Sequence, residues 1–266
     1  MNKLCKVILA LILIVVIAAA VYIANGLFGN PVSKYLATKC AEEHLEEAYG
    51  ECDFLLDEVV FNFKTGAYYA YVSSPSSIDS SFTLAIAQNG ELIFDDYSDR
   101  VTSGWNTARR IDDEYRALTL EIIDGEAFPY DAHIGFGEIV FVSREHIDNY
   151  TPSYALITED LILDGEYDAT EMGAIAGCIT LYVYSEEVTA ENLAQMLLDI
   201  KEAFDKGGVD FYAIKCILEN EGNNSADSQR IEVMNFLYSD IYEDGLIERV
   251  IESNDRAREY YEEQTK

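Results

Sequence analysis

Residues Val7 to Ala24 read VILALILIVVIAAAVYIA, a run of 18 residues without a charge, a proline or a glycine. At about 1.5 Å per residue, a helix of this run is roughly 27 Å long, close to the ~30 Å hydrocarbon core of a bilayer. Lipid offers no hydrogen-bond partners to the backbone, so a single segment crosses as a helix. Lys3 and Lys6 precede the run, and basic residues stay on the cytoplasmic side. The sequence therefore predicts a cytoplasmic tail (1–6), a transmembrane anchor (7–24) and an extracytoplasmic remainder.

Two other uses of this run compete with the anchor. Ala18 to Ala20 offer a signal-peptidase site, but the apolar run continues beyond them and exceeds the roughly 7–15 residues of a signal-peptide core. Lipidation requires a cysteine at the end of the run, and neither Cys5 nor Cys40 lies there. We therefore expect an uncleaved anchor on the cell membrane, with a cleaved signal peptide as the alternative.

The charge of the chain is strongly negative. It holds 49 Asp and Glu against 18 Lys and Arg, and the first 24 residues contain two of the lysines and no acid. The exterior part thus carries 16 basic residues against 49 acidic ones, a formal charge of −33. Such a field repels nucleic acid and anionic lipid and favours cations, cationic peptides or simple solubility. With 49% hydrophobic residues, the exterior part has ample material for a folded core.

A first α+β unit is predicted at 31–125, after a linker at 25–30. Asn30 and Pro31 are typical of a helix start, and Gly50 of its end. Four antiparallel strands follow, with a Ser-rich loop at 73–81 and an Asn89-Gly90 hairpin turn. Their expected ranges are 55–63, 67–73, 82–87 and 91–94. A helix at 105–122 has an apolar residue every three or four positions, and we expect it to close this unit.

A connection at 126–150, with a strand at 136–142, leads to a second α+β unit at 151–266. Asp168 to Glu171 has the spacing of a capping box before a short helix, and Thr189 caps a longer helix. The other expected elements are strands at 178–184, 209–218 and 230–237, a polar loop at 219–228 and a helix at 246–261. The helix between the first two strands permits a parallel pair without requiring one. The predicted class is α+β, with antiparallel or mixed sheets packed with helices.

Several phrases of the sequence resemble a known family. In the first half they are NGLFGNPVSKYLATKCAEEHLEE (25–47), VVFNFKTGAYYAYVSSPSSID (59–79) and SGWNTARRIDDEYRAL (103–118). In the second half they are ITLYVYSEEVTAENLAQMLLDIKEAF (179–204), FYAIKCILE (211–219) and DIYEDGLIERV (240–250). They are similar to the YfjL-like family of Gram-positive bacteria. The resemblance implies one N-terminal membrane segment and two units, and it transfers no catalytic residue because the family has no characterised activity.

No motif of established chemistry stands out among the polar residues. His44 lies among glutamates on a predicted solvated helix face, and neither His133 nor His146 has a metal-ligand spacing. Asp164, Glu166 and Asp168 form a weak candidate site for a divalent cation, although turn and cap roles explain the same residues. We therefore expect no cofactor and no metal.

The exterior cysteines permit two disulfides without requiring them. Cys40 and Cys52 form a candidate local pair, whereas Cys178 and Cys216 fall in predicted core strands that suit buried free thiols equally well. The spacing leaves both interpretations open.

Trp105, Arg109 and Arg110 mark a candidate partner surface, because they form a basic spot in an acidic chain. The simpler interpretation pairs the arginines with acids on their own helix. With no catalytic signature present, the function we expect is an interaction module of the cell envelope, acting on a protein or peptide and not on nucleic acid. The alternatives are an acidic binder of cations or cationic peptides and an unrecognised hydrolase.

Overall fold

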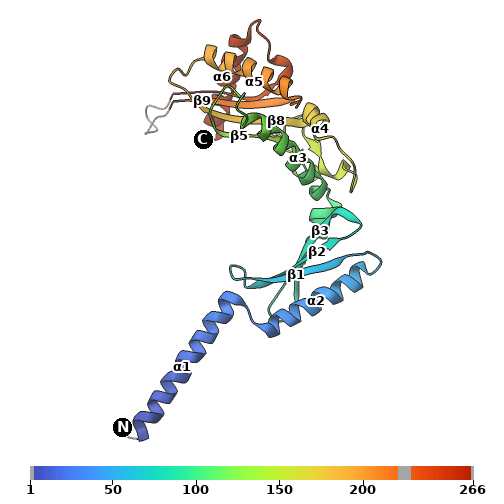
Figure 1. Ribbon diagram of the computed structural model, residues 1–266, viewed down its shortest axis with the longest axis vertical. Coiled ribbons are helices and arrows are strands. Elements are labelled where there is room, and N and C mark those ends of the chain that lie inside the picture. Colours follow the sequence, from blue (N-terminus) through green and yellow to red (C-terminus); the bar gives the residue numbers. More distant parts are fainter. Residues whose placement is uncertain (1–2, 221–228, 265–266) are drawn as a thin grey trace. The chain divides into compact units, whose positions relative to one another are not determined.

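The computed structural model describes residues 3–220 and 229–264 and has an α+β fold, as expected (Figure 1). By contacts the chain divides into two units, 1–106 and 107–266. The start of the expected tail (1–2), most of the expected polar loop (221–228) and the last two residues (265–266) lie outside the described residues.

The N-terminal helix α1 runs from Lys3 to Phe28. It is long and apolar enough to cross a membrane, and a signal sequence can have the same length and apolar composition. The expected linker at 25–30 is mostly wrong, because α1 continues through its first four residues. Gly29 ends the helix with a φ of +70°. This left-handed backbone conformation is strained for residues other than glycine.

Helix α2 (Pro31–Tyr49) begins at Asn30 as predicted. The Asn30 side-chain oxygen accepts the backbone N–H of Ser33 at 2.8 Å, and Pro31 occupies the first turn, where no donor is needed. One face of α2 packs on the first sheet through four residues spaced four apart: Ser33, Ala37, Ala41 and Leu45.

The first sheet is an antiparallel meander of four strands in the order β1-β2-β3-β4, which confirms the prediction. The strands are β1 (Leu55–Asn62), β2 (Ala67–Ser74), β3 (Ser77–Ile86) and β4 (Leu92–Asp95). The expected Ser-rich loop is wrong in extent, because β3 already begins at Ser77 and only a turn at Pro75 and Ser76 precedes it. A π-helical turn, η1 (Ser98–Thr102), follows the sheet.

Helix α3 (Trp105–Ile123) forms where expected but belongs mainly to the second unit. Its buried Ile111, Tyr115 and Ile123 are part of that unit's hydrophobic core. The apolar stripe predicted that one face of the helix is covered, but a stripe cannot say which sheet covers it.

The second sheet has the order β10-β9-β8-β5. Its strands are β5 (Ala132–Ile139), β8 (Gly177–Tyr184), β9 (Ala213–Glu219) and β10 (Arg230–Leu237). Strands β8 and β9 are parallel, joined through α5 (Ala190–Gly207), and the other pairs are antiparallel. The expected connection at 126–150 therefore contains an edge strand of this sheet, and the strand expected from 209 begins only at Ala213.

Short elements and two further helices complete the second unit. Helix α4 (Ala169–Ala176) is capped by Asp168, and α6 (Leu246–Gln264) ends the described chain. The small elements are β6 (Phe141–Val142), η2 (Arg144–His146), β7 (Leu156–Ile157), η3 (Thr158–Asp160) and η4 (Tyr238–Asp240). Strands β6 and β7 pair in parallel.

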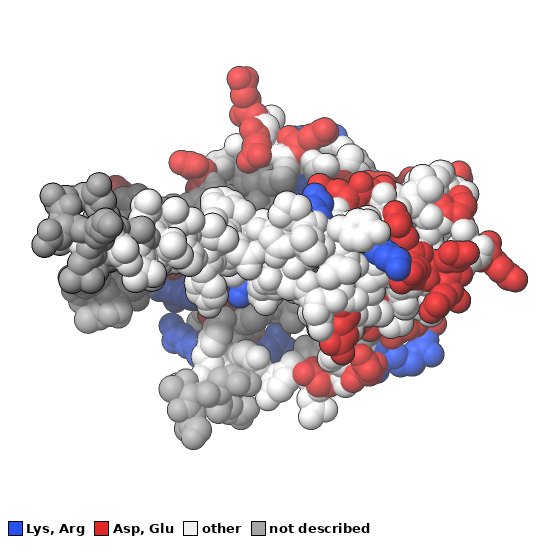
Figure 2. Space-filling model, turned by 90° about the horizontal axis from the view of Figure 1, so that it is seen from below, with Lys and Arg blue, Asp and Glu red and all other residues white. Residues whose placement is uncertain are grey.

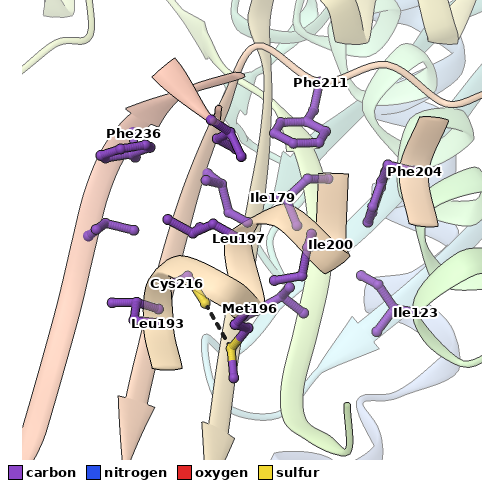
Figure 3. Packing of buried hydrophobic residues seen from close by; sticks show 14 of the residues in the cluster. Ile123, Ile179, Leu193, Met196, Leu197, Ile200, Phe204, Phe211, Cys216 and Phe236 are labelled. Atoms are coloured by element: carbon purple, nitrogen blue, oxygen red, sulfur yellow. Dashed lines mark hydrogen bonds between the residues drawn. The ribbon is translucent and has the colours of Figure 1, made fainter. Parts of the chain in front are cut away.

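The core of the second unit lies between α5 and one face of the sheet. Leu197, Ile200 and Phe204 of α5 are fully buried and lie close to Ile179 of β8 (Figure 3). The Cys216 thiol of β9 lies 3.6 Å from the Met196 sulfur of α5. This face is therefore sealed by close-packed apolar side chains.

Candidate functional site: a groove on the second sheet

The second face of this sheet carries a groove of about 420 Å³. Side chains alternate between the two faces of a strand, so residues next to those of the core point to this second face. Twelve residues from the four strands and from the segment around Pro152 line it: Ile134, Phe136, Glu138, Val140, Pro152, Tyr154, Cys178, Thr180, Tyr182, Lys215, Met234 and Asn235. We call them the open-face groove. It combines aromatic and aliphatic walls with a few polar groups, as small-ligand and peptide sites do.

Side chains of α3 occupy the β5 edge of the sheet. The Thr119 hydroxyl accepts the Gly137 N–H at 3.0 Å, and the Asp112 carboxylate accepts the Ile139 N–H at 2.7 Å. Gly137 permits this approach, because a Cβ there would lie 2.5 Å from the Thr119 methyl carbon. The β5 edge is thus closed to pairing by an added strand at these positions.

The β10 edge is occupied in a similar way by α6. The Asn254 side-chain oxygen accepts the Glu232 N–H of β10 at 3.0 Å, and both residues are buried. At these positions neither edge of the sheet is therefore open to an added strand.

Glu138 of β5 is the acidic residue that lines the groove. Burial raises the pKa of its carboxyl, the nearby Asp112 raises it further, and Arg116 and Lys215 oppose the shift. Arg116 itself lies over the Phe136 ring, 4.7 Å from its centroid. The groove thus places a carboxyl that holds its proton more tightly than usual beside two basic side chains.

Cys178 is unsuited to nucleophilic chemistry. Burial raises the pKa of its thiol to about 11, so the reactive thiolate is scarce at neutral pH. Tyr154 also lines the groove, and its hydroxyl donates to the Asn235 side-chain oxygen at 2.8 Å. Burial also raises the pKa of the Tyr154 phenol.

All five cysteines are free. Cys178 lines the groove, whereas Cys216 belongs to the core on the other face, and this separation explains why the two do not pair. Cys40 and Cys52, the candidate local pair, are also unbonded.

The weak cation candidates Asp164, Glu166 and Asp168 do not form a metal centre in the structure. Among the side chains that the structure describes, no group of three or more from His, Cys, Asp or Glu is placed to hold a metal ion. Asp168 instead caps α4 by accepting the Thr170 and Glu171 N–H groups, at 2.8 and 3.1 Å. The Arg110 guanidinium donates to the Gly165 carbonyl at 2.9 Å, which places a protein cation at this loop.

The candidate partner surface consists of two exposed residues and one that is partly covered. Arg109 lies 3.8 Å from Asp113 and Arg110 lies 3.9 Å from Glu114, both pairs one helical turn apart. Trp105 is exposed near the start of α3. Pairing within the helix therefore accounts for much of the basic charge of this spot.

The expected solvated role of His44 is wrong. Its Nε2 lies 2.7 Å from the Asp95 carboxylate of β4, and the Tyr49 hydroxyl donates to the same carboxylate oxygen at 2.7 Å. His133 stacks on Tyr184 at a centroid distance of 3.9 Å, and the His146 ring is 2.6 Å from the Ser143 hydroxyl. Sequence spacing missed the contact of His44 because Asp95 lies 51 residues away.

Sequence reasoning also missed the open-face groove. Glu138 and Lys215 are charged residues flanked by apolar ones in β5 and β9, and alternation along these strands places each on the face opposite the core. The sequence therefore contained the signal that these residues lie on the second face. It did not show which other residues lie beside them there.

Two domain models match most of the chain. The YfjL-like, N-terminal domain matches residues 4–96, and the YfjL-like C-terminal domain matches residues 114–251. No curated protein and no solved structure matches it. The two matches together confirm the resemblance seen in the sequence: the chain belongs to the YfjL-like family.

Proposed function

We propose that this protein is a membrane-anchored, extracytoplasmic interaction module that binds a segment of another envelope protein in its open-face groove. The groove is the observation that carries the proposal, because it offers apolar and aromatic walls, an acidic and a basic side chain, and a cysteine whose thiol is not activated. Lys3 and Lys6, in the first turns of α1 and before its apolar run, support an N-terminus in the cytoplasm and an exterior location for both units.

The composition of the groove favours an apolar peptide as its ligand. Phe136, Tyr154 and Tyr182 supply aromatic surface, which contributes strongly to protein interfaces. Lys215 lies 5.8 Å from the centroid of the Tyr182 ring and offers a positive charge in an otherwise acidic protein. The expected ligand is a short segment with an apolar side chain and a carboxylate close to it.

Two other functions retain a specific observation in their favour. The chain holds 49 acidic residues against 18 basic ones, and the red patches in Figure 2 are more extensive than the blue ones, which favours binding of cations or cationic peptides. The pKa values of Asp112 and Glu138 are both raised, mainly by burial, and a carboxyl that retains its proton suits a hydrolase. The groove holds one of these carboxyls rather than a catalytic pair facing a ligand, so we rank binding first.

Site-specific cross-linking tests the proposal. Photoreactive benzoylphenylalanine replaces Tyr182 in the full-length protein. Cross-linking is carried out in the membranes of the cells that produce this variant. The control places the same group at Tyr242, an exposed tyrosine of the same unit that is outside the groove. We expect the Tyr182 position to give one cross-linked partner. The yield of the same product from the Tyr242 position should be lower by a factor of at least about five.

A second substitution separates specific binding from chance contact. Lys215→Ala should reduce the cross-link from the Tyr182 position, because it removes the positive charge of the groove. Equal products from both positions, or a product unaffected by Lys215→Ala, would contradict binding in the groove.

A further inference from the structure

Acidic residues are absent from the first 41 positions of the chain, although the exterior part as a whole is strongly acidic. The first acid is Glu42, in the middle of α2. Lys34 and Lys39 lie before it, so the segment 25–41 has a formal charge of +2. The repulsion of anionic lipid expected from the net charge therefore does not apply to this end of the exterior part.

The same segment exposes large apolar side chains. Phe28 at the end of α1 is 79% exposed, and Val32 and Tyr35 in the first turns of α2 are 68% and 66% exposed. Aromatic and aliphatic side chains beside lysines are typical of segments that lie in the membrane interface. We call Phe28, Val32, Lys34, Tyr35 and Lys39 the membrane-proximal surface.

The exposed side of α2 changes its chemistry along the helix. Its other side is buried against the first sheet throughout, from Ser33 to Leu45. Val32 and Tyr35 come first on the exposed side, and Lys39 follows, 3.3 Å from Glu43. Glu42, Glu46 and Glu47 are exposed toward the end of α2. The gradient from apolar through basic to acidic is what a helix leaving a lipid surface requires.

The junction with α1 keeps this surface close to the membrane helix. The hydroxyl of Tyr68, a buried residue of β2, forms two hydrogen bonds with the backbone of Asn30. It accepts the Asn30 N–H at 3.0 Å and donates to the Asn30 carbonyl at 3.0 Å. A side chain at Gly29 would collide with Tyr68 and Phe61. Two residues, Gly29 and Asn30, are the whole connection between α1 and α2.

We propose that the membrane-proximal surface docks on the lipid surface, with its apolar side chains among the head groups and its lysines against anionic phosphates. Charge complementarity and continuity with the membrane helix identify lipid as the occupant. Glu58 of β1 and Lys34 line a separate cavity of about 510 Å³ at the junction of α1 and α2. Glu58 near Lys34 and Glu43 near Lys39 are acids that oppose the interaction. The inference rests on the membrane anchoring in the proposed function and is independent of the open-face groove.

Tryptophan quenching by brominated lipid tests the docking. Trp105 is the single tryptophan of the chain, so Trp105→Phe gives a background without tryptophan fluorescence. Full-length variants carrying Tyr35→Trp, Ala48→Trp or Val15→Trp are placed in vesicles of brominated phosphatidylcholine with about a third of anionic phosphatidylglycerol. Ala48 is an exposed residue near the far end of α2, and Val15 lies within the apolar run of α1.

If the surface docks, the brominated lipid should reduce the fluorescence of Tyr35→Trp at least twofold. The fluorescence of Ala48→Trp should fall by less than about a tenth of its value without brominated lipid. Adding Lys34→Glu and Lys39→Glu should halve the quenching of Tyr35→Trp. Equal quenching of Tyr35→Trp and Ala48→Trp, or quenching unchanged by the two glutamates, overturns the proposal. The Val15→Trp variant reports whether α1 is inserted in the membrane. If its fluorescence is not quenched, the membrane anchor itself is contradicted. If it is quenched while Tyr35→Trp is not, only the docking of the membrane-proximal surface is refuted.

Discussion

The two faces of the second sheet are built from the same strands, yet they differ in what covers them. On one face, α5 seals the core with Leu197, Ile200 and Phe204. On the other, Ile134 is 44% exposed, and the groove admits solvent beside Glu138 and Lys215. Both edges are blocked by helix side chains. The difference teaches that close apolar packing is concentrated on one face, and the other face is the one on which we propose binding.

The largest expected effect separates the two faces by stability. Leu197→Ala removes a fully buried side chain from the sealed face and should lower the free energy of unfolding by about 2–5 kcal/mol. Urea or thermal unfolding of the full chain in detergent measures it. A loss below about 1 kcal/mol would show that the sealed face is loosely packed and would weaken the comparison.

The next effect tests the closed β5 edge. Thr119→Val removes the hydroxyl that accepts the Gly137 N–H, and leaving that buried donor unpaired should cost about 1–3 kcal/mol. Thr119→Ser keeps the hydroxyl and is the matched control. Hydrogen exchange at the Gly137 amide should accelerate in the valine variant and stay slow in the serine variant. Equal exchange in both variants would mean that Thr119 does not protect the edge.

A smaller effect concerns pH and the open face. Because the pKa of Glu138 is raised above its usual 4.5, the folded chain binds this proton more tightly than the unfolded chain. The stability contributed by this group is therefore greatest at low pH and declines as pH rises through the raised pKa. Glu138→Gln should raise the melting temperature slightly at pH 8 and leave it unchanged at pH 4. A uniform change at both pH values would exclude titration of Glu138 as the cause.

The smallest effect is expected for Ile134→Ala on the open face. Its side chain is half exposed, so the free energy of unfolding should change by less than about 1 kcal/mol. The cross-link from the Tyr182 position should nevertheless fall, since Ile134 lines the groove. If unfolding is as sensitive to this substitution as to Leu197→Ala, the two faces are equivalent in packing and the assignment of binding to one of them fails.

The sequence by itself determined the local features of this protein. Apolar composition and length defined α1, and the helix starts at Asn30, Asp168 and Thr189 follow from side chains that accept nearby N–H groups. The Asn89-Gly90 turn is encoded in the same way, with Gly90 at a φ of +85°. These features depend on residues a few positions apart, which is why they are readable in order along the chain.

Only the tertiary structure decided which elements cover each other. It assigned α3 to the second unit, made β5 an edge of the second sheet and paired His44 with Asp95. It also gathered Glu138, Cys178 and Lys215 from three strands into one groove. An apolar stripe or an alternating strand specifies that a face is buried, but the free energy of burial is nearly the same against any complementary apolar surface. Partner choice depends on the packing of the whole unit, and the candidate site is made by that choice.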